Sequence, residues 1–144
     1  MNFIDSCFEP ILSLSKEIRY GIYTTQSGVK ASLRIPQFFE GHAGISHGGV
    51  IALIFDEAMG WACVNINNSP AYTQRLKVTY ISPIFVGEPY SLEAKVESSE
   101  KDKLTVIATI FDISGDVVAS ATGLFHCIKV EFLNFKIQDL SHQV

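Results

Sequence analysis

The sequence has few of the features that mark secreted, metal-binding or nucleic-acid-binding proteins. Its 144 residues include three cysteines, Cys7, Cys63 and Cys127, without CxxC spacing or companion histidines at the intervals of metal ligands. Lys and Arg number 11 against 15 Asp and Glu, a net charge of −4, and they form no cluster suited to a phosphate backbone. We therefore predict reduced thiols, no metal and no nucleic-acid partner.

Long uncharged apolar runs are also missing. None approaches the roughly 18 residues that cross a bilayer, and Met1–Pro10 lacks the basic start, apolar core and cleavage pattern of a secretory signal. With 47% apolar and 18% charged residues, the composition is that of a globular domain. We predict one cytoplasmic domain over 1–144 without membrane contact, with 1–16 as an N-terminal arm or short helix and 131–144 as a tail.

The stretch Ser46–Cys63 is predicted to form the one long helix of the chain. Between Val50 and Val64 its residues are apolar or small on every side of the helix, except for the adjacent acids Asp56 and Glu57. A helix that is apolar all round is a buried helix. Burying an ionised carboxylate is costly unless it is paired or its pKa shifts, so this pair of acids is the strongest functional clue in the sequence.

Alternating patterns predict strands on both sides of this helix. They comprise a hairpin within Glu17–Ile35 and four further strands over Tyr72–Ile81, Tyr90–Glu97, Lys103–Asp112 and Val117–Val130. In the first of the four, strict alternation puts Thr73 on the same face as Arg75 and away from Leu76. Short polar turns favour antiparallel pairing of the last three. Because an apolar helix needs cover from more than one sheet face or from a second copy of itself, we predict an α+β domain whose sheet wraps around the helix, and the pattern indicates a dimer.

The predicted start of the helix carries a glycine pair, Gly48 and Gly49, with Ser46 as the predicted N-cap. Backbone N–H groups at a helix N-terminus are unpaired and carry partial positive charge, which suits an oxyanion or a polarised carbonyl. A tight entry turn is the simpler explanation for a glycine pair taken alone. His47 fits a ligand contact and an ordinary loop anchor equally well.

The spacing between the glycines and the acids separates their roles. Asp56 follows Gly48 at a distance of roughly 12 Å along a helix axis, so one carbonyl cannot contact both in a single chain. Two helices that lie antiparallel across a twofold axis would bring the start of one beside the middle of the other. The helical neighbours of Asp56, Ala52 and Gly60, are small and leave space, whereas Glu57 points about 100 degrees away. Asp56 is therefore the candidate catalytic acid and Glu57 its candidate support, although a salt bridge or backbone hydrogen bond is the commoner role of a single buried acid.

The segment GHAGISHGGVIALIFDEAMGWA resembles the signature of hotdog-fold acyl-CoA thioesterases, in particular the phenylacetic-acid-pathway group. The family's order and spacing are matched by HGG at His47–Gly49, the acid Asp56, Thr73 and the segment TYISPI at Thr79–Ile84, and the resemblance covers Arg34–Ile128. It implies an antiparallel five- to six-stranded sheet wrapped around one long central helix, in homodimers that often pair into homotetramers.

The resemblance also implies an activity, the hydrolysis of an acyl-CoA thioester to free acid and CoA. The Gly48 N–H would polarise the thioester carbonyl, Asp56 of the partner subunit would act as general base or nucleophile, and Thr73 would position the water. No cofactor is expected, because a thioester is activated enough for a polarised carbonyl, a water and a carboxylate to suffice. His47 and Glu57 complete the candidate catalytic set.

The candidate substrate-binding residues lie on several predicted elements. They are Gly49, His42, Trp61, Ser82, Pro83, Lys101 and Lys103. The resemblance places the last four near the CoA moiety, although two lysines on one turn are more often a solvated hairpin tip. A hydrophobic acyl tunnel is suggested by four aromatic side chains, Phe38, Phe39, Trp61 and Phe85. Some family members carry Asn near Gly41, where this chain has Gly41 and His42.

Two other functions fit parts of the same pattern. Acyl-thioester dehydratases and hydratases use a His before the helix and a Glu on it, which His42 and Glu57 resemble, but HGG at the helix entry and Asp56 count against this alternative. The same fold also serves as a non-catalytic acyl-CoA sensor or assembly module. Hydration of an enoyl thioester, or tight acyl-CoA binding without thiol release, would distinguish them.

Overall fold

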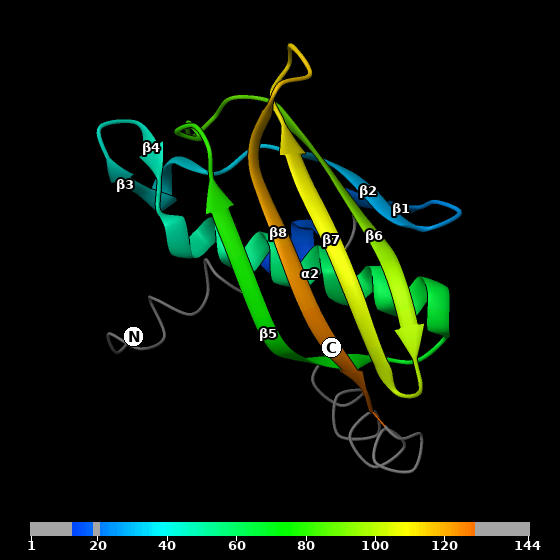
Figure 1. The fold of residues 1–144 in the computed structure, drawn as a ribbon. Helices are drawn as coiled ribbons and strands as arrows, with labels where there is room; N and C mark the ends of the chain where they lie inside the picture. Colours follow the sequence, from blue (N-terminus) through cyan, green and yellow to red (C-terminus); the bar gives the residue numbers. More distant parts are fainter. Residues whose placement is uncertain (1–12, 19–20, 129–144) are drawn as a thin grey trace.

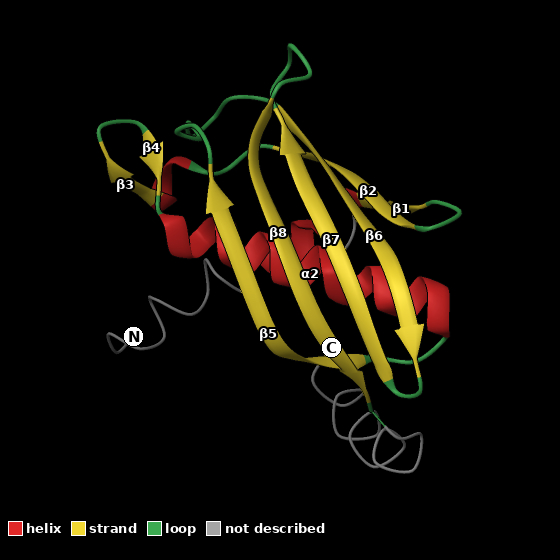
Figure 2. Ribbon diagram, viewed as in Figure 1, coloured by secondary structure: helices red, strands yellow, loops and turns green. Residues whose placement is uncertain are grey.

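The computed structural model describes residues 13–18 and 21–128, in which a long helix lies beside an antiparallel sheet (Figure 1, Figure 2). The elements in chain order are β1 (Ile22–Thr24), β2 (Gly28–Leu33), the 3-10 turn η1 (Gln37–Phe39), β3 (Glu40–His42), β4 (Ile45–Ser46), α2 (Gly48–Asn67), β5 (Ala71–Tyr80), β6 (Tyr90–Glu100), β7 (Lys103–Phe111) and β8 (Val117–Cys127). The predicted long helix, the first hairpin and the four later strands are therefore present.

Six strands form one sheet in the order β1-β2-β6-β7-β8-β5, and every neighbouring pair runs antiparallel. Figure 1 shows α2 crossing behind the sheet, with β5 to β8 lying over its length. The predicted meander is confirmed for β6, β7 and β8, which pair in sequence order. Since β5 pairs with β8 at the edge, the chain passes from that edge to the middle of the sheet after Tyr80. This sheet around one central helix is the hotdog fold that the resemblance implies.

One face of α2 forms the core with the sheet. Its fully covered residues follow the helical repeat: Ile51, Ile54, Phe55, Ala58, Met59, Ala62 and Cys63. They belong to the same buried cluster as Val106 and Phe125 of the sheet, and burial of each large apolar side chain contributes about 1.5–3 kcal/mol. The opposite face, termed the open face, is only partly covered in a single chain, and Asp56 and Glu57 are half-buried there. The prediction that both acids are buried is therefore wrong for the single chain. The apolar pattern indicates that the helix face becomes covered, but it does not indicate whether the same chain or a second chain covers it.

By length and composition, α2 would also suit a membrane span. Core helices of many proteins meet the same test, and the covered stripe of α2 packs against the sheet as such a helix does.

β5 contains a β-bulge that reverses part of its predicted pattern. Its register with β8 shifts between Thr73 and Arg75, so that Thr73 pairs with Phe125 and Arg75 pairs with Leu124. Phe125 is buried in the core, and Thr73 opposite it therefore faces α2 as well. The predicted alternation, with Thr73 and Arg75 on one face, is wrong because the bulge adds a residue to β5. The bulge turns Thr73 toward Asp56 of the helix.

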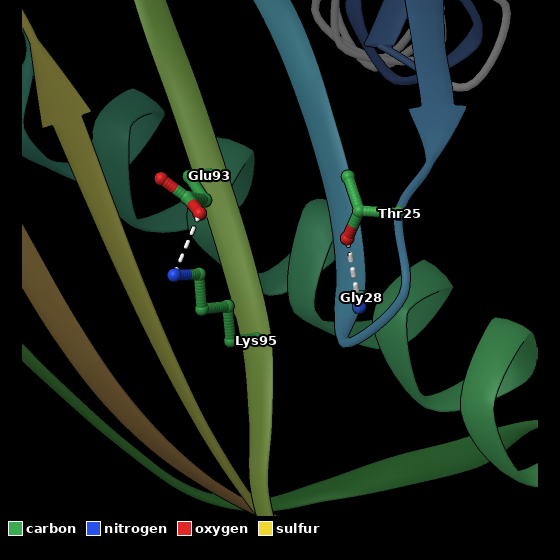
Figure 3. A network of polar contacts seen from close by, with 4 residues as sticks. All are labelled: Thr25, Gly28, Glu93 and Lys95. Atoms are coloured by element: carbon green, nitrogen blue, oxygen red, sulfur yellow. Dashed lines mark hydrogen bonds and ion pairs between the residues drawn. The ribbon is translucent and has the colours of Figure 1, made fainter.

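Hydrogen bonds close the turn between β1 and β2 and connect it to α2. Gly28 N donates to Thr25 Oγ1 at 3.0 Å (Figure 3). Thr25 N in turn donates to Gly28 O at 2.9 Å. Asn65 of α2 donates from Nδ2 to Thr25 O at 3.0 Å and to Gly28 O at 2.8 Å. Glu93 and Lys95 of β6, in the same view, form a partly exposed ion pair at 2.9 Å that contributes little in solvent. The C-terminal part of α2 therefore fixes the edge hairpin of the sheet.

Gly28 leaves no room for a side chain in this hairpin. A Cβ atom there would lie 1.9 Å from the carbonyl oxygen of Ala94 on β6. Gly28→Ala is therefore expected to lower the free energy of unfolding by about 3 kcal/mol, because β2 and β6 must move apart. Denaturant titration followed by circular dichroism measures the loss, and Ser27→Ala in the same turn is expected to stay within about 0.5 kcal/mol of the original protein. An unchanged midpoint in Gly28→Ala would contradict the pairing of β2 with β6.

The two ends of the predicted domain fall partly or wholly outside the described residues. Residues 13–18 are helical, with Leu14 and Ile18 buried, whereas the rest of the predicted arm and the tail at 131–144 lie outside. Between β2 and α2, the segment Pro36–Ile45 contains η1 and β3 and reaches β4, which pairs with β3 in a small separate sheet. This small sheet leads directly into α2.

Cys63 lies on the covered face of α2 and has no exposed surface. Burial raises the pKa of its thiol from 9.0 to about 12, and the nearby Cys127 adds to the rise. Both are free thiols, while Cys7 lies outside the described residues. Because the unfolded thiol ionises near pH 9 and the folded one near pH 12, the stability tied to this group is intact below pH 9 and is lost as the pH rises toward 12.

The difference in burial between the two thiols predicts a difference in reactivity. A thiolate is the reactive form, so a buried neutral thiol reacts slowly. Iodoacetamide at pH 8 is expected to label Cys127, which is partly exposed, in the native protein and Cys63 only after unfolding. Peptide mass mapping of labelled samples with and without denaturant measures this. Labelling of Cys63 at the same rate in both samples would contradict its place in the core.

Candidate functional site

The first turn of α2 presents two backbone N–H groups that are not hydrogen-bonded to any described residue. His47 is the N-cap residue, with φ −55° and ψ 136°, and its side chain makes no capping hydrogen bond. Its carbonyl oxygen accepts Val50 N at 3.1 Å and Ile51 N at 3.4 Å, which leaves the N–H groups of Gly48 and Gly49 without a partner in the described part of the chain. Such donors at a helix start lie at the positive end of the helix dipole.

Ser46 does not cap the helix, contrary to the sequence prediction. It ends β4 and is buried, and its hydroxyl donates to the carbonyl oxygen of His47 at 3.2 Å instead of accepting from an N–H of α2. The prediction is wrong because α2 begins at Gly48, so the N-cap position falls on His47.

Neither glycine of the pair is required by the backbone of this chain. Neither has a positive φ. A Cβ atom at Gly49 would meet nothing within 4 Å, and one at Gly48 would meet the ring of Tyr80 at an ordinary contact distance of 3.4 Å. Glycine in a helix costs about 0.5–1 kcal/mol relative to alanine. The backbone of the entry turn therefore does not require the glycine pair.

Asp56 lies on the open face of α2, next to β5. Thr73 donates a hydrogen bond from Oγ1 to Asp56 Oδ1, a contact that depends on the bulge of β5. Both residues line a hollow of about 340 Å³ whose apolar wall includes Trp61 and Phe125. Between the described residues no other hydrogen bond reaches this carboxylate. Its second oxygen is therefore available to accept a hydrogen bond from a water or a ligand.

Glu57 points along another side of the helix. It accepts a hydrogen bond from Trp61 Nε1 at 3.1 Å, across the four-residue spacing at which helical side chains meet. Both residues line the same hollow as Asp56. The contact engages the Glu57 carboxylate and orients the indole of Trp61.

The two histidines before α2 have different surroundings. His47 is exposed, and its ring lies against Gly41, where a Cβ atom would be 2.9 Å from His47 Nδ1. The imidazole therefore occupies the space that a side chain at position 41 would need. His42 is exposed at the end of β3 and does not line the hollow that contains Glu57.

The remaining candidates lie in two other hollows. Ser82 and Pro83 line one of about 280 Å³ beside Tyr80, near the start of α2. Lys101 and Lys103 line another of about 810 Å³ at the turn between β6 and β7. Within a single chain, the predicted site residues therefore lie in three separate places: the start of α2, the hollow that Asp56 lines, and the turn between β6 and β7.

The predicted acyl tunnel is not assembled within one chain. Phe39 is buried, whereas Phe38 and Phe85 are 67% and 45% exposed. Among the four aromatic residues of that prediction, Trp61 is the one that lines the hollow of Asp56 in the described structure.

Tyr80 contacts the start of α2, and the sequence prediction did not single it out. At the end of β5 its hydroxyl donates a hydrogen bond to the carbonyl oxygen of Gly48, 32 residues earlier in the chain. The sequence carries no local signal for this contact, apart from the presence of Tyr80 in the family-like segment Thr79–Ile84.

Comparison with known proteins identifies relatives of this chain. Residues 43–119 match the family described as the thioesterase superfamily. A protein of Saccharolobus solfataricus named as a candidate esterase is 25% identical over 131 residues, which cover 89% of this chain and 92% of that protein.

Solved structures share the fold. A thioesterase superfamily protein of 30% identity has a TM-score of 0.64 over 69% of this chain and 48% of its own, so this chain spans about half of its length. The PaaI protein of the E. coli phenylacetic acid degradation operon has 18% identity and a TM-score of 0.70, over 85% of this chain and 93% of its own. A hypothetical thioesterase of Streptococcus pneumoniae with coenzyme A has 14% identity and a TM-score of 0.70, over 78% of this chain and 95% of its own. At these last two identities the likeness concerns the fold alone.

Proposed function

The chain belongs to the thioesterase superfamily, and we propose that it is an acyl-CoA thioesterase that releases a free acid and CoA. The observation that carries the proposal is the contact between Asp56 and Thr73 in a hollow with apolar walls. A carboxylate beside a hydroxyl suits general-base activation of a water. Trp61 and Phe125 supply an apolar surface for the acyl group.

The proposed site is shared by two subunits. Gly48 and Asp56 of one chain lie roughly 12 Å apart along α2, and the helix face that carries Asp56 is open in a single chain. A second copy laid antiparallel across a twofold axis would cover this face and bring its Gly48 beside that Asp56. Gly49 and Gly60, which have nothing within 4 Å of a Cβ position, support such a close approach. The proposed assembly is a homodimer, and the family resemblance implies its further pairing into a homotetramer.

The proposed chemistry divides the work between these groups. The Gly48 N–H of one subunit hydrogen-bonds to the thioester oxygen and stabilises the negative charge that develops there. Asp56 of the partner subunit takes a proton from a water positioned by Thr73, and the water oxygen attacks the carbonyl carbon. When the C–S bond breaks, the thiolate of CoA takes up the proton and the free acid leaves. In the nucleophilic alternative Asp56 attacks the carbonyl first, CoA leaves, and water then hydrolyses the resulting anhydride.

CoA is the proposed carrier of the acyl group. Support comes from the Streptococcus pneumoniae protein of the same fold, whose structure contains coenzyme A. Lys101 and Lys103 are the cations proposed to meet its phosphates, in a hollow that Glu100 and Asp102 also line. Because acidic and basic side chains both line this hollow, the two lysines are proposed to bind the phosphates by individual contacts and not through a positive charge of the whole hollow.

A panel of acyl-CoA substrates with aryl, medium-chain and long-chain groups tests the proposal. Release of free thiol, followed with a chromogenic reagent, is expected to exceed the spontaneous rate for at least one class. Hydration of an enoyl thioester in place of thiol release would favour the dehydratase alternative. Tight binding without any turnover would favour the acyl-CoA sensor.

A further inference from the structure

The two unpaired N–H groups at the start of α2 belong to peptide groups that are both held at their carbonyl ends. The N–H of Gly48 shares its peptide with the carbonyl of His47, which the next N–H groups of the helix use as an acceptor. The N–H of Gly49 shares its peptide with the carbonyl of Gly48, and this oxygen accepts the hydroxyl of Tyr80. A hydrogen bond at the carbonyl end of a peptide strengthens its N–H as a donor by about 10–30%. Tyr80 therefore acts on the Gly49 N–H through one peptide group.

Tyr80 is well placed to hold this peptide in position. Its ring lies against the backbone of Gly48, 3.4 Å from the site of a Cβ atom. β5 begins near Asp56, which Thr73 contacts, and ends at Gly48, which Tyr80 contacts. One strand therefore contacts both of the α2 residues to which the proposed function assigns a catalytic role, Asp56 and Gly48.

We propose that Tyr80 is a positioning residue of the thioesterase site. Its hydroxyl fixes and polarises the Gly48–Gly49 peptide, so that the Gly49 N–H joins the Gly48 N–H as a second donor to the thioester oxygen. The inference rests on the proposed function, because it assigns this hydroxyl to the same oxyanion site. Two convergent N–H groups stabilise a developing oxyanion better than one.

Kinetics of Tyr80→Phe test this role, because phenylalanine keeps the ring and removes the hydroxyl. If one donor contributes about 10²–10³ to the rate, a gain of 10–30% in its strength predicts a fall in kcat of between about twofold and eightfold. KM is expected to change by less than about twofold, since the effect belongs to the transition state. Tyr72→Phe is the matched control. Tyr72 is the other half-exposed tyrosine of β5, stacks on His126, and is expected to leave kcat unchanged.

A spectroscopic readout separates this role from simple packing. In 15N-labelled protein without substrate, Tyr80→Phe is expected to shift the amide nitrogen of Gly49 upfield by more than that of Gly48, because only the Gly49 peptide loses its hydroxyl partner. An unshifted Gly49 signal, or a shifted signal with wild-type kcat, would overturn the positioning role alone. A wild-type protein that hydrolyses no acyl-CoA would overturn the proposed function, and this role with it.

Discussion

Replacing Asp56 with Asn is expected to lower kcat for acyl-CoA hydrolysis by about 10²–10⁴-fold while the fold stays intact. The amide keeps the size of the side chain and an oxygen that accepts the hydroxyl of Thr73. It can neither take a proton from water nor attack as a carboxylate. Asp56 is half-buried and forms no ion pair with any described residue, so the loss of its charge leaves no buried cation unpaired. Steady-state thiol release measures the loss, and the melting temperature checks the fold.

Glu57→Gln is the matched control for this substitution, one position further along the same helix. The glutamine oxygen can still accept the indole N–H of Trp61, so kcat is expected to stay close to the wild-type value. Turnover close to wild type in Asp56→Asn would contradict the assignment of the catalytic acid. Loss of activity confined to Glu57→Gln would exchange the roles of the two acids.

The helix and the strands were predictable because each carries a signal in its own local sequence. The apolar and small residues from Val50 to Val64 indicate a core helix, and alternation marks the strands before any contact between them is known. The bulge of β5 has no such signal, because it arises from the register with β8. The bulge determines on which face of the sheet Thr73 lies. The family resemblance assigned Thr73 to the site, whereas the alternation pattern assigned it to the face that points away from α2.

The candidate site was predictable where helix geometry alone determines it. The spacing of Gly48 and Asp56 along α2 gives their separation, and hence the argument for two subunits, without any tertiary information. The partial exposure of the two acids was not predictable. An apolar helix face indicates that other residues cover it, but it does not indicate whether they belong to the same chain or to a second one. Tyr80 escaped prediction for a different reason, since its hydroxyl meets a backbone carbonyl that no side-chain pattern identifies.

Gly48→Pro is expected to lower kcat by about 10²–10³-fold, because proline lacks the N–H that is proposed to hold the thioester oxygen. Proline suits the first position of a helix, and His47 before it already has a ψ of 136°, which a following proline requires. Gly48→Ala is the control, since it keeps the N–H and places its Cβ at an ordinary 3.4 Å from the ring of Tyr80. An equal loss of kcat in both variants would show that the added side-chain volume at position 48, and not the missing N–H, causes the effect.

Two such inactive variants are expected to recover activity when they are combined in one dimer. Asp56→Asn retains Gly48, and Gly48→Pro retains Asp56. If each site takes its N–H from one subunit and its carboxylate from the other, a mixed dimer holds one complete site and one site that lacks both groups. Co-expression with two affinity tags and tandem purification isolates this dimer, whose kcat is expected to reach about half of the wild-type value. A mixed dimer no more active than its parents would assign both groups of a site to the same chain, against their separation of roughly 12 Å along α2.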